Sequence, residues 1–182
     1  MKLSKLPIEG LILIEPTVFE DPRGYFFESF HQEKFNEVAG QDVRFVQDNE
    51  SKSNKGVLRG LHFQAPPKSQ GKLVRVIKGS VLDVVVDIRM SSPTYGQHYK
   101  VELTEQNKRQ LYVPEGFLHG FATLEDNTIF NYKCTDFYAP ETEGSVLWSD
   151  KLLNIDWCLD SPLVSAKDEV AQTFDTFKSP FN

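Results

Sequence analysis

The stretch LVRVIKGSVLDVVVDI, residues 73–88, decides the fold class. Two runs rich in Val, Leu and Ile flank a Lys78-Gly79 pair, which is typical of a tight turn. Both runs have the length and the β-branched composition of strands. The stretch therefore predicts a β-hairpin within a protein that is built mainly from strands.

The second run, residues 81–88, places two kinds of side chain on opposite faces, because successive residues of a strand alternate. Every second residue from Leu82 to Ile88 is apolar, which predicts a face in the core. The other face holds Asp83 and Asp87. For Asp87 we expect a solvated outer face, which is the usual place of a carboxylate, whereas Asp83 is left open.

Short apolar runs recur along the chain at roughly 8–12-residue spacing and favour a β-sandwich or barrel. Two short helices are expected: one at residues 31–39, ending at Gly40, and one after Ser165, with Asp168 three residues beyond this N-cap. Residues 149–165 are interpreted as irregular chain laid across the barrel. Strands are expected near residues 43–47, 57–64, 73–77, 81–88, 99–104, 110–113 and 128–135.

The composition limits what the protein can be. Its 182 residues fit one domain, residues 1–182, and 40% hydrophobic with 12% aromatic residues can build a sizeable core. A net charge of −6 argues against a general nucleic-acid binder, and the longest apolar run, residues 11–14, is too short for a membrane span. Cys134 and Cys158 offer no disulfide framework, and the first residues do not read as a signal peptide. We expect a cytoplasmic protein.

Two of the four histidines, His62 and His119, lie in strand-like surroundings, whereas His31 and His98 are interpreted as surface or structural. His62 interrupts an apolar strand, and a Pro/Gly turn delivers His119 to the next strand. Each alone is typical of a hydrogen-bonded core histidine. A site would require the fold to bring three further residues to them: Arg59, Lys72 and Tyr132.

The spacing Pro114-x-Gly116-x-x-His119 resembles the second half of the motif found in cupins. A metal-binding cupin normally also supplies His-x-His and a Glu from its first half, but here His62 stands alone. Two imidazoles without a carboxylate make a poor transition-metal site. We therefore expect no bound metal.

Arg59 and His62 are three positions apart, so strict alternation places their side chains on opposite faces of the strand. Gly60 between them is a candidate for a β-bulge that redirects one of the two. The sequence leaves both arrangements open.

Seven motifs lie in order at compatible spacing. They are FEDPRGYFFESF (19–30), QDNESKSNKGVLRGLHFQ (47–64), QGKLVRVIKGSVLDVVVDIR (70–89), SPTYG (92–96), VPEGFLHGF (113–121), YKCTDFYAPETEG (132–144) and SAKD (165–168). Together they resemble the dTDP-4-dehydrorhamnose 3,5-epimerase family over essentially the whole chain. This resemblance implies an all-β fold, a cupin-type jelly-roll barrel with a few short helices. It also implies a homodimer that works without a metal or an organic cofactor.

The implied reaction inverts C3 and C5 of dTDP-4-keto-6-deoxy-D-glucose and so supplies the precursor of dTDP-L-rhamnose. Epimerisation beside a ketone requires a base, an acid on the opposite face, and a donor at the keto oxygen. The resemblance gives His62 as the base with Asp168 as its carboxylate partner, Tyr132 as the acid, and Lys72 at the C4 oxygen. A relative that inverts only C3 or only C5 is the alternative within the family.

The resemblance also implies a binding set for the nucleotide sugar. Arg23, Arg59 and Lys167 are expected at the diphosphate or neighbouring oxygens, and Tyr138 is expected to stack on thymine. Further residues implied to line the site are Glu28, Gln47, Asp48, Asn49, His119 and Glu143. In the dimer, Arg23 and Glu28 are expected to reach the partner's site.

Roles outside this set are open. Asp83 is expected to tune Lys72 or to support the site, and Cys134 to serve in packing alone. Two other classes are weighed against the epimerase: a non-catalytic cupin that binds nucleotide sugars, and a metal-dependent cupin isomerase or dioxygenase.

Overall fold

The two halves of the central stretch lie in different sheets of the computed structural model, which describes residues 1–182. Strand β7 (Lys72–Lys78) pairs with β10 (Gln110–Val113) and β12 (Thr128–Cys134). Strand β8 (Ser80–Asp87) pairs instead with β9 (His98–Thr104) and β11 (Phe117–Thr123). The predicted hairpin is therefore wrong. Gly79, with a φ of +77°, redirects the chain from one sheet to the other, where each strand has two other partners.

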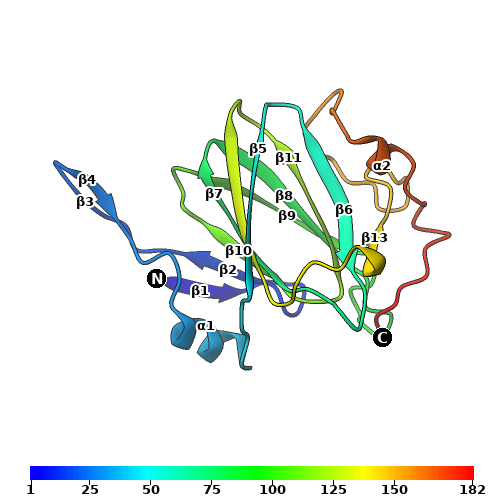
Figure 1. Ribbon diagram of the computed structural model, residues 1–182, viewed down its shortest axis with the longest axis horizontal. Coiled ribbons are helices and arrows are strands. Elements are labelled where there is room, and N and C mark those ends of the chain that lie inside the picture. The colour runs from blue at the N-terminus through cyan, green and yellow to red at the C-terminus, as the bar shows by residue number, and fades with distance from the viewer.

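The strands form two antiparallel sheets that face each other (Figure 1). A six-stranded sheet has the order β1-β2-β10-β7-β12-β5, and a five-stranded sheet has the order β13-β6-β11-β8-β9. This confirms the expected all-β jelly roll of the cupin type. The strands not yet given are β1 (Lys2–Lys5), β2 (Ile12–Glu15), β5 (Gln47–Ser53), β6 (Leu58–Gln64) and β13 (Glu143–Ser145).

A hairpin formed by β3 (Phe19–Asp21) and β4 (Gly24–Phe26) projects away from both sheets, at the left of Figure 1. We call residues 19–26 the arm. Its side chains make little contact with the rest of the chain: Phe19 is 63% exposed, Tyr25 57% and Phe26 70%. Exposed aromatic residues so close together are unusual for a surface that only meets water.

The two helices lie where the sequence predicted them. Helix α1 (Gln32–Ala39) ends at Gly40 and packs Phe35 against the outer face of the six-stranded sheet. Helix α2 (Ala166–Glu169) follows Ser165, whose side chain accepts a hydrogen bond from the Asp168 N–H. Figure 1 shows α2 beside β6. A short 3-10 helix spans Pro140–Thr142.

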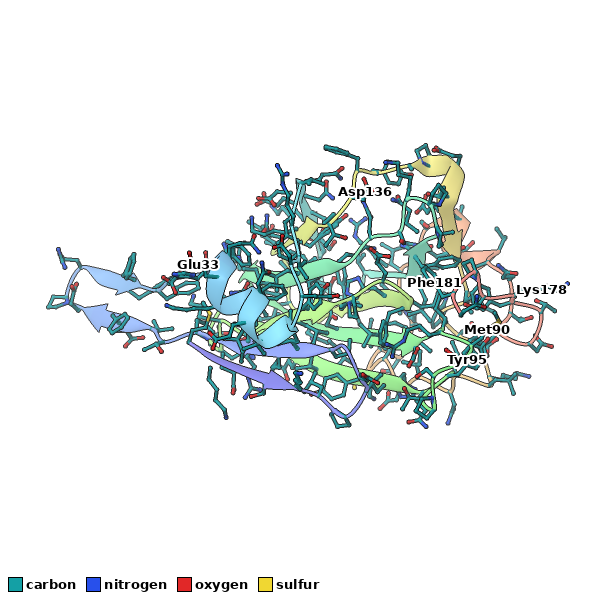
Figure 2. The ribbon with its side chains drawn as sticks, turned by 90° about the horizontal axis from the view of Figure 1, so that it is seen from below. Glu33, Met90, Tyr95, Asp136, Lys178 and Phe181 are labelled. Carbon is teal, nitrogen blue, oxygen red and sulfur yellow. The ribbon has the colours of Figure 1, made fainter.

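The apolar core is divided into three parts. One part fills the space between the sheets, a second lies under α1, and a third covers the outer face of the five-stranded sheet. Residues 149–165 belong to the third part and form irregular chain, as predicted, with Leu153 and Trp157 buried against the sheet. The chain end closes this layer, since Met90 N–H donates to Phe181 O at 3.1 Å, at the opposite end of the molecule from the arm (Figure 2).

Strand β8 is buried on both faces, which corrects the expectation for Asp87. Its alternation is as predicted, but the apolar face that includes Val84 and Val86 packs under the outer layer. The face that carries Asp83 and Asp87 points into the barrel, and both carboxylates are fully buried. Asp87 accepts hydrogen bonds there from its neighbours Arg89, Ser92 and Thr94.

The strand predictions failed at β5 and in the arm, which have no apolar run, and they also omitted β2, although its sequence ILIE is largely apolar. The predicted strand at residues 43–47 is wrong, because β5 begins only at Gln47 and continues through a polar sequence, QDNESKS. This edge strand shows no apolar alternation that a pattern could detect. The strands of the arm were missed for a similar reason, since both their faces are exposed.

We expect Asp87→Asn to remove part of the acid sensitivity of the fold. Burial alone would raise the pKa of Asp87, but the hydrogen bonds from Arg89, Ser92 and Thr94 lower it from 3.8 to about 2. Because the folded pKa is the lower one, this stabilisation is complete above about pH 5 and is lost as the pH falls through 2, by about 2 kcal/mol in total. Urea unfolding at pH 6 and pH 3 measures it. An equal loss of stability in wild type and variant between these pH values would contradict the assignment.

Candidate active site

Two adjoining cavities, of about 470 Å³ and about 330 Å³, are lined in common by His62, Lys72 and Tyr132. His62 comes from β6 in the five-stranded sheet, whereas Lys72 and Tyr132 come from β7 and β12 in the six-stranded sheet. The imidazole therefore stands on one wall of the barrel, and the ammonium and the phenol stand on the other.

A β-bulge in β6 resolves the question of Arg59 and His62. His62 pairs with His119 of β11, but Arg59 pairs with Phe121, so β6 has one residue more than β11 over this step. Gly60 lies in the bulge with a φ of +134°, and a Cβ atom there would come within 2.6 Å of the Gly120 Cα. The bulge lets both Arg59 and His62 line the larger cavity.

His62 is held by a buried carboxylate. Its Nε2 atom lies 2.6 Å from Asp168 Oδ1, and Asp168 is only 2% exposed at the start of α2. Burial would raise the pKa of Asp168, but the hydrogen bonds from His62, Ser165 and the Gly60 backbone keep it below its ordinary value. Asp168 is thus ionised at neutral pH and fixes the orientation of the imidazole.

Lys72 is the cation of the cavity. It is half-buried, and no hydrogen bond or ion pair in the structure engages its ammonium. Removal of this group from water lowers the pKa of Lys72 below its ordinary value. Acidic groups nearby oppose that shift only in part; they are Cys134, Glu143 and Asp83. The ammonium is therefore available to an oxygen of a ligand.

Tyr132 presents a protonated phenol. Burial raises the pKa of Tyr132 above its ordinary value, and this exceeds the lowering by a hydrogen bond from Asn49. At neutral pH the hydroxyl keeps its proton and can donate it to a bound molecule.

A second imidazole–carboxylate pair lies next to the first. His119 Nε2 is 2.9 Å from Asp83 Oδ2, and His119 is the direct cross-strand neighbour of His62. Asp83 is fully buried, and its other carboxylate oxygen has no hydrogen-bond partner. Asp83 thus contacts His119 and also lies near enough to Lys72 to act on its pKa, so both roles expected for Asp83 stay predictions.

Polar side chains surround the smaller cavity at the barrel mouth. Gln47 and Asn49 enter it from β5, opposite Tyr138. The Tyr138 ring is 55% exposed, and its hydroxyl donates to Glu143 at 2.9 Å. Lys167 forms an ion pair with the same carboxylate at 2.7 Å. This surface offers one open aromatic ring, on which a flat ring system can stack.

Three expected residues are not brought to these cavities. Arg23 lies at the tip of the arm and pairs with Asp21, and Glu28 pairs with Lys34 beside α1. Asp48 points to the other side of β5, because it alternates with Gln47 and Asn49, and it forms an ion pair with Lys133. The other predicted residues line the cavities of their own chain, except Lys167, which reaches the rim through its ion pair with Glu143.

Several lining residues were missed by the sequence analysis. Phe121, Phe130 and Val164 give the larger cavity an apolar side, and Ser51 adds a buried hydroxyl without a partner. Phe121 and Phe130 carried a usable signal, because each stands two residues from a predicted site residue, His119 or Tyr132, on the same strand face. The structure contains no group of three His, Cys, Asp or Glu side chains placed to hold a metal ion. None of its helices has the length and apolar character needed to cross a bilayer.

The chain is similar to known proteins over almost its whole length. The family model described as dTDP-4-dehydrorhamnose 3,5-epimerase matches residues 5–176. The dTDP-4-dehydrorhamnose 3,5-epimerase of Shigella flexneri is 53% identical over 174 residues, 96% of each chain.

Solved structures are similar over almost the whole chain. A dTDP-6-deoxy-D-glucose-3,5-epimerase from Legionella pneumophila, in complex with dTDP-4-keto-L-rhamnose, is 47% identical with a TM-score of 0.93; 97% of this chain and 94% of that chain are covered. ChmJ, a 3'-monoepimerase from Streptomyces bikiniensis in complex with dTDP-quinovose, is 38% identical with a TM-score of 0.90, over 94% of this chain and 87% of that chain.

We expect Gly60→Ala to lower the free energy of unfolding by about 2–4 kcal/mol, because a methyl group would collide with the Gly120 backbone and the backbone conformation would be strained. Gly56→Ala is the matched control. Gly56 also has a positive φ, +87°, but a Cβ atom there would meet nothing within 4 Å, so its cost is about 1–2 kcal/mol. Urea unfolding compares the two. Equal destabilisation would show that the close approach of the two strands is unimportant.

Proposed function

The chain belongs to the dTDP-4-dehydrorhamnose 3,5-epimerase family, and from this premise we propose that it inverts C3 and C5 of dTDP-4-keto-6-deoxy-D-glucose to give dTDP-4-keto-L-rhamnose. The observation that supports this most directly is the placement of His62 across one cavity from Lys72 and Tyr132. His62 can remove a proton from one face of the sugar, and Tyr132 can deliver a different proton to the opposite face of the flat enolate that results.

His62 removes the proton. Its Nε2–H is directed to Asp168, so the other ring nitrogen keeps a lone pair for the substrate C–H. The electron pair of the broken C–H bond forms a C=C bond to C4, and the negative charge moves to the C4 oxygen. Asp168 stabilises the imidazolium that results.

Lys72 and Tyr132 complete the step. The Lys72 ammonium donates to the charged C4 oxygen of the enolate. Tyr132 then delivers its proton to the opposite face of the carbon, and solvent restores the phenol while the imidazolium loses its proton to solvent. Because these groups balance every proton and electron, the reaction needs neither a metal nor an organic cofactor.

The nucleotide half is assigned to the smaller cavity and its rim. Tyr138 stacks on thymine, and Gln47, Asn49 and Glu143 line the pocket around it. Lys167 at this rim and Arg59 in the adjoining larger cavity bind the diphosphate, with His119 beside the sugar. Asp48, which faces away from the cavities, has no place in this assignment.

We propose a homodimer in which the arm of each protomer enters the site of the other. Two features support this: the exposed aromatic residues of the arm, and the separation of Arg23 and Glu28 from the cavities of their own chain. Each protomer, residues 1–182 in one catalytic domain, would then donate Arg23 and Glu28 to its partner. Action in the cytoplasm stays a prediction.

A regioselective epimerase is the second candidate, because the chain is also similar to a 3'-monoepimerase. The same base and acid serve both reactions, since selectivity depends on how the ring is held. Nuclear magnetic resonance of the product distinguishes inversion at C3, at C5 or at both.

We expect His62→Ala and Tyr132→Phe to fail at different steps in heavy water. Without the base, deuterium exchange at C3 and C5 and inversion both fall by about 10²–10⁴. Without the phenol hydroxyl, His62 still exchanges the proton on its own face, so exchange persists while inversion is largely lost. Both rates are followed by NMR with chelator-treated protein and the dTDP-keto sugar.

His98→Ala is the control, because His98 lies on β9 and lines neither cavity. Full exchange by His62→Ala would remove His62 as the base, and inversion by Tyr132→Phe at the wild-type rate would assign the acid to another group. A wild-type protein that binds the nucleotide sugar without any exchange would be a binding protein instead.

Refolding a mixture of Arg23→Ala and His62→Ala chains tests the exchange of arms. In a two-fold dimer, the mixed species has one site that combines an intact cavity with an intact arm. With equal amounts of the two chains, about a quarter of wild-type activity returns. Mixing His62→Ala with Tyr132→Phe is the control, since both changes lie in the cavity and neither site is repaired. If the first mixture gains no activity, Arg23 does not act in the site of the partner.

A further inference from the structure

A chain of hydrogen bonds runs from the backbone of Tyr138 to the thiol of Cys134. The Tyr138 N–H donates to Gln47 Oε1 at 3.0 Å, and Gln47 Nε2 donates to Asn49 Oδ1 at 3.1 Å. Asn49 Nδ2 then donates to Cys134 Sγ at 3.6 Å. We call Gln47, Asn49 and Cys134 the amide–thiol chain.

The register of β5 and β12 brings this chain to the phenol of Tyr132. Tyr132 pairs directly with Asn49, and Cys134 pairs with Gln47. Tyr132 and Cys134 are two residues apart and share one face of β12. Asn49 and Tyr132 are therefore cross-strand neighbours, and both line the smaller cavity.

The two ends of the Asn49 amide are fixed by different neighbours. Gln47 donates to its oxygen, and the Cys134 sulfur accepts from its nitrogen, so a reversed amide would place donor against donor. The second N–H of the amide has no partner in the chain and is free to donate to the phenol oxygen of the neighbouring Tyr132. Such a bond would leave the phenol O–H for the substrate, and the same N–H would stabilise the phenolate after the proton has left.

We propose that Cys134 is a positioning residue of the epimerase: by orienting Asn49, its thiol sets the phenol of Tyr132 for proton delivery. The thiol is fully buried and lines neither cavity, so its action is indirect. This goes beyond packing, the only role expected for Cys134 from the sequence. It rests on the proposed function, in which Tyr132 is the acid.

Cys134 has a second neighbour that offers a different explanation. In the register of β12 and β7 it lies opposite Lys72. An effect through Lys72 would weaken enolate formation and would slow exchange and inversion together. An effect through Asn49 and Tyr132 would slow inversion alone. The ratio of the two rates separates the routes.

Cys134→Ala, Cys134→Ser and Cys158→Ala are compared in the heavy-water assay. Cys134→Ala removes the acceptor, and we expect inversion to fall about 10-fold while exchange stays within about 3-fold of wild type. Cys134→Ser keeps an acceptor of similar size and retains inversion within about 3-fold. Cys158 is exposed and remote, so Cys158→Ala leaves both rates unchanged.

Asn49→Asp gives an independent measurement should Cys134→Ala fold poorly. A carboxylate in place of the amide has no N–H for the phenol oxygen, so inversion falls while exchange persists.

The proposal is overturned if Cys134→Ala keeps wild-type inversion, if exchange and inversion fall in proportion, or if Cys134→Ser behaves like the alanine variant. A wild-type protein that produces no inversion would instead overturn the proposed function.

Discussion

The close approach of β6 to β11 at Gly60 and Gly120 is the constraint on which the site depends. Only two residues without side chains allow these backbones to come so near, and the extra residue of β6 is accommodated there. A regular strand would turn Arg59 away from the face that holds His62. Because the bulge brings both onto one cavity, the guanidinium and the imidazole can act on the same bound molecule.

Each wall of the barrel then supplies a different part of the chemistry. The carboxylate behind His62 comes from α2, 106 residues further along the chain, and the cap at Ser165 sets the start of that helix. On the facing wall, burial shifts the pKa of Lys72 down and that of Tyr132 up. Both shifts follow from the same loss of water, and both groups keep a donor directed at the cavity.

The sequence predicted local structure better than it predicted neighbours. Alternation in residues 81–88 identified which side chains share a face. It did not indicate that a second layer covers the apolar face from outside, so the face of Asp87, expected in solvent, in fact points into the barrel. The turn at Gly79 was recognised, yet its direction depends on partners distant in the chain. Polar β5 gave no signal at all, and motif resemblance alone pointed to Gln47 and Asn49. The sequence allowed either a regular strand or a bulge at Gly60, and the register of β6 and β11 shows the bulge.

The apolar core has three parts, and two of them lie outside the barrel, away from the cavities in which a substrate would bind. The cluster between the sheets has 13 buried residues, while the two outer clusters have 12 and 6 and join strand residues to segments that wrap the barrel, such as those that carry Trp157 and Phe35. A sugar ring can therefore replace water in the cavities while the outer packing stays in place. Saturating the protein with a nucleotide sugar should thus leave the sheets where they stand, and truncation should be most harmful in the wrapping C-terminal chain, which packs against the outer face of the five-stranded sheet.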